Sequence, residues 1–257
     1  MVDKDGDEQS RKRLWSLIGL LSKKQLGTFE EKDAPTLISE VHELNMEQFI
    51  RIQAKNFYDE FPFKELKDQL IADFTVMEHC RRRDDFEGFS LAAFQQIENI
   101  TNNIFIKMNI WSKAIADKDL QMFTSINKEK ETKRYGFTLG SQIVYSMGPD
   151  KEKTIREFFN KPAEKVDFVP KFKLILYFSY FNERIKTSDE WNQVFNLGYD
   201  IYLSRNRNHR GAINTESQAR KQEQITKGKY KYYLLFLGYL ADFVQKVSST
   251  YGVLEKG

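Results

Sequence analysis

A polar cluster in the C-terminal part of the chain has the residue types that acid–base chemistry on a phosphate needs. It runs from Arg205 to Arg210 and reads Arg-Asn-Arg-Asn-His-Arg. The His209 imidazole titrates near neutral pH, so it can accept or donate a proton. The Arg205 guanidinium is always charged and can bind a phosphate and stabilise its extra negative charge. The cluster therefore suits RNA cleavage in which the ribose 2′-OH is the nucleophile and no metal ion or other cofactor is needed.

The two amides between these groups extend the site. Asn206 and Asn208 can orient the imidazole or hydrogen-bond to phosphate oxygens. The helix expected over residues 189–208 carries Arg205 and His209 four positions apart, which is an offset of about 40° around the axis. Both side chains are therefore expected on one side of the helix, and Gly211 is a suitable stop signal. The same side carries a stripe of core residues at steps of three and four: Trp191, Val194, Phe195, Gly198 and Tyr202.

Positive charge is concentrated around the cluster. Between Arg205 and Lys231 there are eight Lys or Arg residues and two acids, although the whole chain carries a net charge of only +3. A local positive field is what a phosphate-bearing partner such as RNA requires. We expect RNA contacts from Asn206, Arg207, Asn208, Arg210, Lys229 and Lys231. The aromatic residues of 230–243 are expected to be mainly core, and Tyr230 and Tyr232, beside these lysines, are the candidates for base stacking.

The elements that must position this site are helices. Helical spacing of apolar residues predicts an all-α, multi-helix bundle, whereas no stretch alternates convincingly enough for strands. The residues between the helix expected at 189–208 and the last helix are interpreted as a basic loop, and 112–150 as a connection with one short element. Helices are expected at 10–24, 35–44, 46–57, 63–83, 86–111, 150–160, 170–186, 189–208 and 228–249.

The longest predicted helix, 86–111, is unusually polar for a core element. Its amides and acid are expected to lie mainly on a solvent-exposed face, although they could also line the cleft opposite Arg205 or form a buried network in a dimer interface. Glu98 is the first candidate partner for Arg205 or His209. The polar residues of this helix are Gln95, Gln96, Glu98, Asn99, Asn102 and Asn103.

A second basic run follows His79 and Cys80. It comprises Arg81 to Arg83, and it could contact nucleic acid. The alternative is a helix end whose charges are solvated and paired with Asp84, Asp85 and Glu87. His42 is interpreted as a helix surface residue, and Cys80 as a packing residue.

Several classes of protein are not favoured. A single cysteine and three histidines argue against a disulfide framework or a zinc site. No glycine-rich phosphate loop occurs. The first residues are acidic and polar, unlike a secretory signal, and the apolar stretch 14–21 is too short to span a membrane. A cytoplasmic protein without membrane contact is therefore expected.

The cluster resembles the motif of the HEPN superfamily, in which an Arg, often followed by Asn, precedes a His by four to six residues. Here Arg205-Asn206 precedes His209 with a shortened spacing of three residues. The resemblance covers about residues 84–250 and implies a helical bundle, a homodimer and metal-independent endoribonuclease activity, with toxin or antiviral-defence systems as the setting and an antitoxin or defence-complex protein as a possible partner. Residues 84–257 would form this bundle, and 1–83 an N-terminal helical region.

Two other functions compete with the ribonuclease. The same basic surface could belong to a non-catalytic RNA-binding or antitoxin-like module, or to a helical adaptor that contacts an acidic protein. The cluster could also be purely structural. Positively charged residues near a helix C-terminus are stabilised by the helix dipole, whether or not they bind a ligand.

Overall fold

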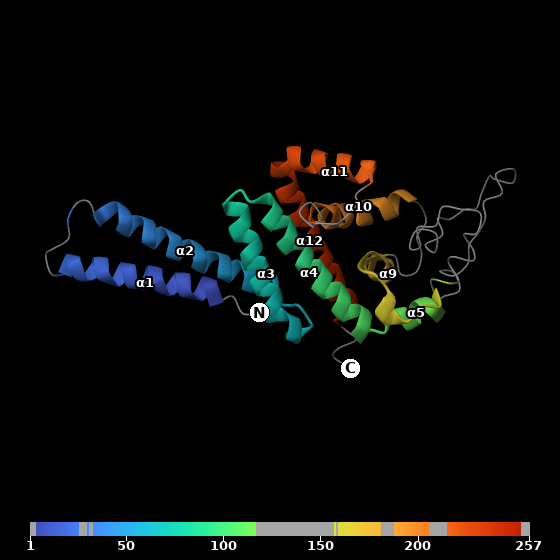
Figure 1. Ribbon diagram of the computed structural model, residues 1–257. Helices are drawn as coiled ribbons and strands as arrows, with labels where there is room; N and C mark the ends of the chain where they lie inside the picture. The colour runs from blue at the N-terminus through green and yellow to red at the C-terminus, as the bar shows by residue number, and fades with distance from the viewer. Residues whose placement is uncertain are drawn as a thin grey trace.

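The computed structural model describes residues 4–25, 30, 33–116, 157, 159–180, 188–205 and 215–252. All regular secondary structure within these ranges is helical, which confirms the all-α prediction. The chain is a bundle of helices from which a two-helix hairpin extends to one side (Figure 1). Residues 117–150, most of 150–160 and 181–187 lie outside the described residues, so the elements expected there stay predictions.

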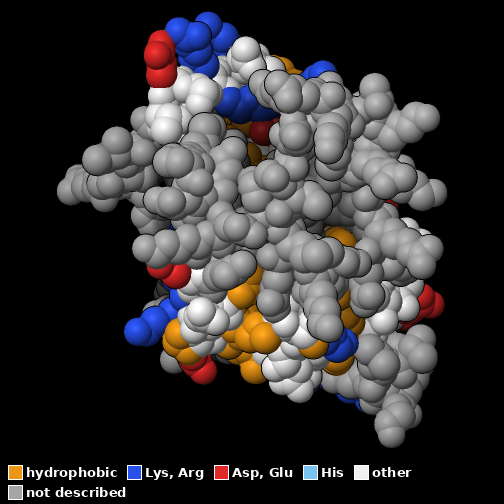
Figure 2. Space-filling model, turned by 90° about the vertical axis from the view of Figure 1, so that its right-hand side faces the viewer, with side chains coloured by type: hydrophobic (Ala, Val, Ile, Leu, Met, Phe, Trp, Pro, Cys, Tyr) orange, Lys and Arg blue, Asp and Glu red, His pale blue; other side chains and the backbone are white. Residues whose placement is uncertain are grey.

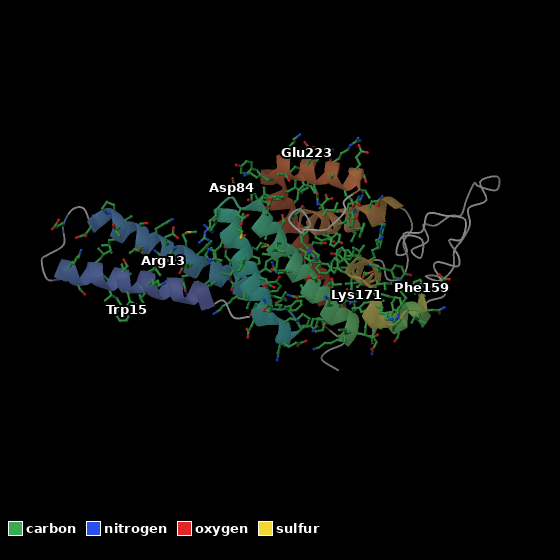
Figure 3. All side chains as sticks on the ribbon, viewed as in Figure 1. Arg13, Trp15, Asp84, Phe159, Lys171 and Glu223 are labelled. Atoms are coloured by element: carbon green, nitrogen blue, oxygen red, sulfur yellow. The ribbon has the colours of Figure 1, made fainter. Side chains whose placement is uncertain are left out.

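The projecting hairpin consists of α1 (Lys4–Gln25) and α2 (Ala34–Phe57), which pack side by side (Figure 1). Separate helices were expected at 35–44 and 46–57, but α2 is continuous, because no proline or glycine interrupts it between these segments. Much of the hairpin's apolar surface is exposed: Trp15 is 71% exposed and points away from α2 (Figure 3). Two helices alone cannot bury all of their apolar residues, so α1 contributes little to the core.

The core of the bundle forms around α4 (Phe86–Lys107), which is flanked by α3, α9, α10 and α12. Its residues at helical spacing are essentially inaccessible, among them Phe89, Ala93, Ile97 and Ile100. The helices around it are α3 (Lys64–Arg82), α9 (Phe168–Tyr180), α10 (Ser188–Arg205) and α12 (Lys229–Tyr251). The boundary expected after residue 83 falls in the turn between α3 and α4, whose buried residues belong to one hydrophobic core.

One helix is shorter than its periodicity predicts. The expected helix 86–111 ends at Lys107, and α5 (Ile110–Ala116) begins in a new direction. Asn109 between them has φ 49°, in the left-handed region that asparagine tolerates better than most residues. The apolar period continues into α5 because Ile110 and Trp111 are also buried, so periodicity alone does not reveal the break.

Candidate functional site at the C-terminal end of helix α10

Helix α10 is held in the bundle along the stripe that the sequence indicates. Trp191 is 1% exposed and its ring stacks on Phe195 at 5.7 Å between centroids. The Val194 carbonyl accepts a hydrogen bond of 2.9 Å from the Tyr239 hydroxyl of α12. The last turn is also buried at Leu203 and Ser204. The end of α10 is therefore fixed by packing, and Arg205 is its last residue.

Arg205 lies against α4. Its guanidinium carbon is 4.2 Å from the centroid of the Phe94 ring, a close cation–π contact. Nη1 of Arg205 is 3.7 Å from Oε1 of Glu98, and the two side chains are 23% and 35% exposed. The expectation that Glu98 is the partner of Arg205 is confirmed by this ion pair.

The Arg205 guanidinium keeps hydrogen-bonding capacity in this position. A separation of 3.7 Å is an ion pair but too long for a hydrogen bond. Among the described residues, no side chain accepts a hydrogen bond from Arg205. A guanidinium has five N–H donors in a fixed plane, which match the oxygens of a phosphate. Phe94 and Glu98 therefore orient the Arg205 guanidinium, and its N–H groups can donate hydrogen bonds to a ligand.

The remainder of the predicted cluster is not described. Asn206, Arg207, Asn208, His209 and Arg210 lie outside the described residues, so their relation to Arg205 stays a prediction.

Helix α11 (Glu216–Lys227) occupies part of the segment that was expected to be a loop, and that expectation is wrong. Thr215 and Gln218 form a capping box: the Thr215 hydroxyl accepts from the Gln218 backbone N–H, and the Gln218 side chain accepts from the Thr215 backbone N–H. The residues Thr-Glu-Ser-Gln at 215–218 contain this signal, so the helix start could have been found in the sequence. The high content of charged residues in α11 obscures its apolar positions, of which Ile225 is buried.

Three polar contacts fasten α11 to the end of α10. The Gln222 amide donates to the Leu203 carbonyl at 2.7 Å, and the Gln218 amide donates to the Tyr199 hydroxyl at 3.0 Å. Lys221 forms an ion pair of 3.1 Å with Asp200, which is 5% exposed. Burial raises the pKa of Asp200, and the contact with Lys221 opposes that rise. Helix α11 therefore supports the turn of α10 that ends in Arg205.

The positive field of this region is weaker than the charge count of the segment indicates. Five of its described cations are paired, two of them with exposed glutamates on α11 itself. Figure 2 shows basic and acidic side chains together at the top of the molecule, at the height of α11 in Figure 1. The pairs are Arg205–Glu98, Arg220–Glu216, Lys221–Asp200, Lys227–Glu223 and Lys229–Asp84. Three of these acids lie outside the counted residues 216 and 223, which is why the count overestimates the field.

Lys229 and Lys231, the two lysines of α12 that were predicted to contact RNA, differ in whether an acid neutralises them. Nζ of Lys229 lies 2.5 Å from Oδ2 of Asp84, and this contact lowers the pKa of Asp84. The Tyr230 and Tyr233 hydroxyls also lie within 3.4 Å of the Asp84 carboxylate. Lys231 is exposed and has no ion-pair partner among the described residues. Of the two, Lys231 is the one whose charge is available to a partner.

The polar side chains of α4 do not all lie on one solvent-exposed face, as was expected. Several of them contact neighbouring helices instead. Gln96 is fully buried, and its carbonyl oxygen accepts a hydrogen bond of 2.6 Å from the Tyr58 hydroxyl. The Asn99 amide donates to Asp73 of α3 at 3.1 Å. Glu98 is the member that faces Arg205. Gln96 and Asn99 thus connect α4 to the end of α2 and to α3 within one chain, and the alternative of a buried network in a dimer interface stays a prediction.

Comparison of the chain with protein-family models, curated proteins and solved structures finds no match. In the part of the chain that the structure describes, no three histidine, cysteine or acidic side chains are grouped to hold a metal ion. None of the described helices combines the length and apolar character that crossing a bilayer requires.

Proposed function

We propose that this chain binds RNA and cleaves it without a metal ion, with Arg205 and His209 as the catalytic pair. Arg205 binds the scissile phosphate, and His209 takes the proton of the ribose 2′-OH, whose oxygen attacks the phosphorus and displaces the 5′-oxygen of the next nucleotide. The observation that carries the proposal is the Arg205 guanidinium, which Phe94 and Glu98 orient while its N–H donors stay uncommitted. The HEPN-like motif around it supports the same function.

The first experiment measures cleavage of a labelled single-stranded RNA in the presence of EDTA. Arg205→Ala and His209→Ala should each slow cleavage by at least ~100-fold, since a positioned acid or base contributes roughly that much. The product should end in a 2′,3′-cyclic phosphate. Arg220→Ala is the matched control, because Arg220 is an exposed arginine of α11 that is paired with Glu216, and this variant should keep full activity.

The outcomes separate the competing functions. Wild-type cleavage rates in both the Arg205 and His209 variants would overturn the proposal. Absence of cleavage by the wild-type chain, combined with salt-sensitive RNA binding that requires Arg205, would favour the non-catalytic RNA-binding module. Absence of RNA binding at low salt would favour the protein adaptor.

A second experiment uses Glu98, which competes with a phosphate for Arg205. Glu98→Gln keeps the shape of the side chain and removes its charge, so RNA affinity should increase by several-fold at low salt. Glu223→Gln is the matched control, because Glu223 is an exposed acid on the outer side of α11 (Figure 3). Equal affinities for both variants would contradict a role of Arg205 in phosphate binding.

The homodimer that the HEPN resemblance implies is part of the proposal and has its own test. If the site is composite, a dimer with one Arg205→Ala chain and one His209→Ala chain keeps one intact Arg205–His209 pair. Mixing and refolding the two inactive variants should then restore part of the activity. An active wild-type chain that is monomeric by light scattering would show that each chain has a complete site.

A further inference from the structure

A second polar site lies where the projecting hairpin joins the bundle. Helices α1, α2 and α3 surround an open cavity of about 350 Å³. This volume is in the range of small-molecule sites in proteins. Its lining includes Arg13, Arg82, Arg83, His42 and His79. Glu43 and Glu47 also line it, so the three arginines exceed the acids by one, and this net positive charge favours an anionic ligand.

The inner arginine of the cavity is held in place. Nη1 of Arg13 lies 2.8 Å from Glu43 and 3.3 Å from Glu47, and its side chain is only 18% exposed. Figure 3 shows Arg13 on the side of α1 that faces α2. The contact with Arg13 lowers the pKa of Glu43, so both groups stay charged. These two acids neutralise Arg13 and fix the position of its guanidinium.

The other two arginines of the cavity lining differ from Arg13. Arg82 and Arg83 are exposed, and neither has a carboxylate partner among the described residues. Arg82 lies over the Phe49 ring at 6.0 Å and donates to the Met46 sulfur at 3.7 Å, contacts that orient the guanidinium without neutralising it. The neighbouring Arg81, in contrast, donates two hydrogen bonds to Glu78 at 2.7 and 3.0 Å.

The charge run at 81–83 was expected to pair with Asp84, Asp85 and Glu87, and for Asp84 and Asp85 this expectation is wrong. Asp84 contacts Lys229, and Asp85 caps α4 by accepting a hydrogen bond from the Gly88 N–H. With these acids engaged elsewhere, Arg82 and Arg83 are available at the mouth of the cavity.

His79 lies on the wall formed by α3 and is half-buried. Burial lowers the pKa of His79, and the charges of Arg83, Arg82 and Arg13 lower it further, whereas Glu47 raises it. The other titratable groups around the cavity are His42 and Glu43. An anion in the cavity would offset the arginine charges and favour the protonated imidazole, so anion binding and proton uptake are linked.

We propose that this cavity binds a small phosphate monoester, with Arg82 and Arg83 as its principal contacts and Arg13 and His79 as the inner wall. A guanidinium pair matches the oxygens of a phosphate, and two arginines can share one dianion. The bound phosphate connects α1 to α3. Binding therefore stiffens the junction between the hairpin and the bundle.

The test is a calorimetric titration of the full chain with inorganic phosphate and with AMP, at constant ionic strength. We expect saturable binding of both at pH 8, where both ligands are dianions. Because a hydrogen bond to a charged group contributes on the order of tenfold in affinity, Arg82→Gln and Arg83→Gln should each weaken binding by about tenfold. Arg51→Gln is the matched control, since Arg51 is an exposed arginine of α2 outside the cavity lining.

Two further measurements make the result unambiguous. Glu43→Gln removes an acid that repels the ligand and should tighten binding, provided that circular dichroism shows intact helices. Phosphate should also slow amide hydrogen exchange in α1. Absence of saturable binding, or equal affinity in the Arg82, Arg83 and Arg51 variants, would overturn the proposal. His209→Ala should bind phosphate normally, so this site can be tested independently of RNA cleavage.

Discussion

Gly198 of α10 permits a close approach of three helices that a larger residue would prevent. A Cβ atom at this position would lie 2.5 Å from Cζ of Phe172 on α9 and 2.6 Å from the Tyr239 hydroxyl on α12. Neither neighbour can yield easily: Phe172 is 2% exposed, and the Tyr239 hydroxyl donates to the Val194 carbonyl. Gly198→Ala should therefore separate α10 from α9 and α12.

Two opposing effects determine how much Gly198→Ala changes the unfolding free energy. Overpacking a filled core costs about 1–3 kcal/mol, whereas replacing glycine by alanine within a helix contributes about 1 kcal/mol of stability. Gly238 of α12 provides a matched control, because a Cβ there meets nothing within 4 Å. Gly238→Ala should therefore stabilise the protein. Since the helix-propensity effect is common to both variants, the difference between their unfolding free energies isolates an overpacking cost of about 1–3 kcal/mol.

The assay is urea unfolding of the wild-type chain and both variants, followed by far-UV circular dichroism, with a common m-value as the condition for comparison. In thermal unfolding the same difference corresponds to about 2–4 °C for each kcal/mol in a chain of this size. Equal stabilisation by Gly198→Ala and Gly238→Ala would refute the reasoning, because it would mean that α10 does not approach Phe172 and Tyr239 as closely as described.

Three further predictions concern buried or capping groups. Burial lowers the pKa of Lys173 to about 8, below its unfolded value, so the unfolded chain binds more protons above pH 8. The contribution of Lys173 to the unfolding free energy should thus rise by about 1 kcal/mol between pH 8 and 9, before tyrosines ionise, and Lys173→Met should remove this contribution. Tyr58→Phe leaves the buried Gln96 carbonyl oxygen without its donor and should cost about 1–3 kcal/mol by urea unfolding, whereas a loss below ~0.5 kcal/mol would contradict the 2.6 Å hydrogen bond. Thr215→Ala removes the capping box and should cost about 0.5–2 kcal/mol, with faster hydrogen exchange in α11 but not in α3 as the diagnostic result.

Sequence patterns predicted most helices well and failed at specific residues. The expected helices 63–83 and 228–249 correspond closely to α3 and α12, because their apolar periodicity is a local property of the chain. The end of α4 was missed because the apolar period continues across Asn109 into α5. Helix α11 was missed because its many charged residues obscure the apolar periodicity, although the capping signal at Thr215 marks its start.

Part of the candidate site could also be predicted. The phase of the helix expected at 189–208 placed Arg205 on its core-facing side near the C-terminal end, and the chemistry of an acid beside a guanidinium singled out Glu98. Both residues lie on helices with strong periodicity, so their faces could be calculated. The contact of Arg205 with the Phe94 ring depends on how α10 packs across α4, and no local pattern contains that information.

What the sequence by itself determined is the helical class of this protein, the position of its principal helices and the residue types at the end of α10. These depend on interactions between residues three or four positions apart. Only the tertiary structure decided which charges are neutralised and which polar groups are buried. Lys229 meets Asp84 across 145 positions of the chain, and Gln96 meets Tyr58 across 38. The same long-range packing pairs Arg205, Lys221 and Lys229 with acids, and among the described residues it leaves Arg82 and Arg83 without a carboxylate partner beside a cavity. A charge can be counted along the chain, but its field depends on the acids that folding brings next to it.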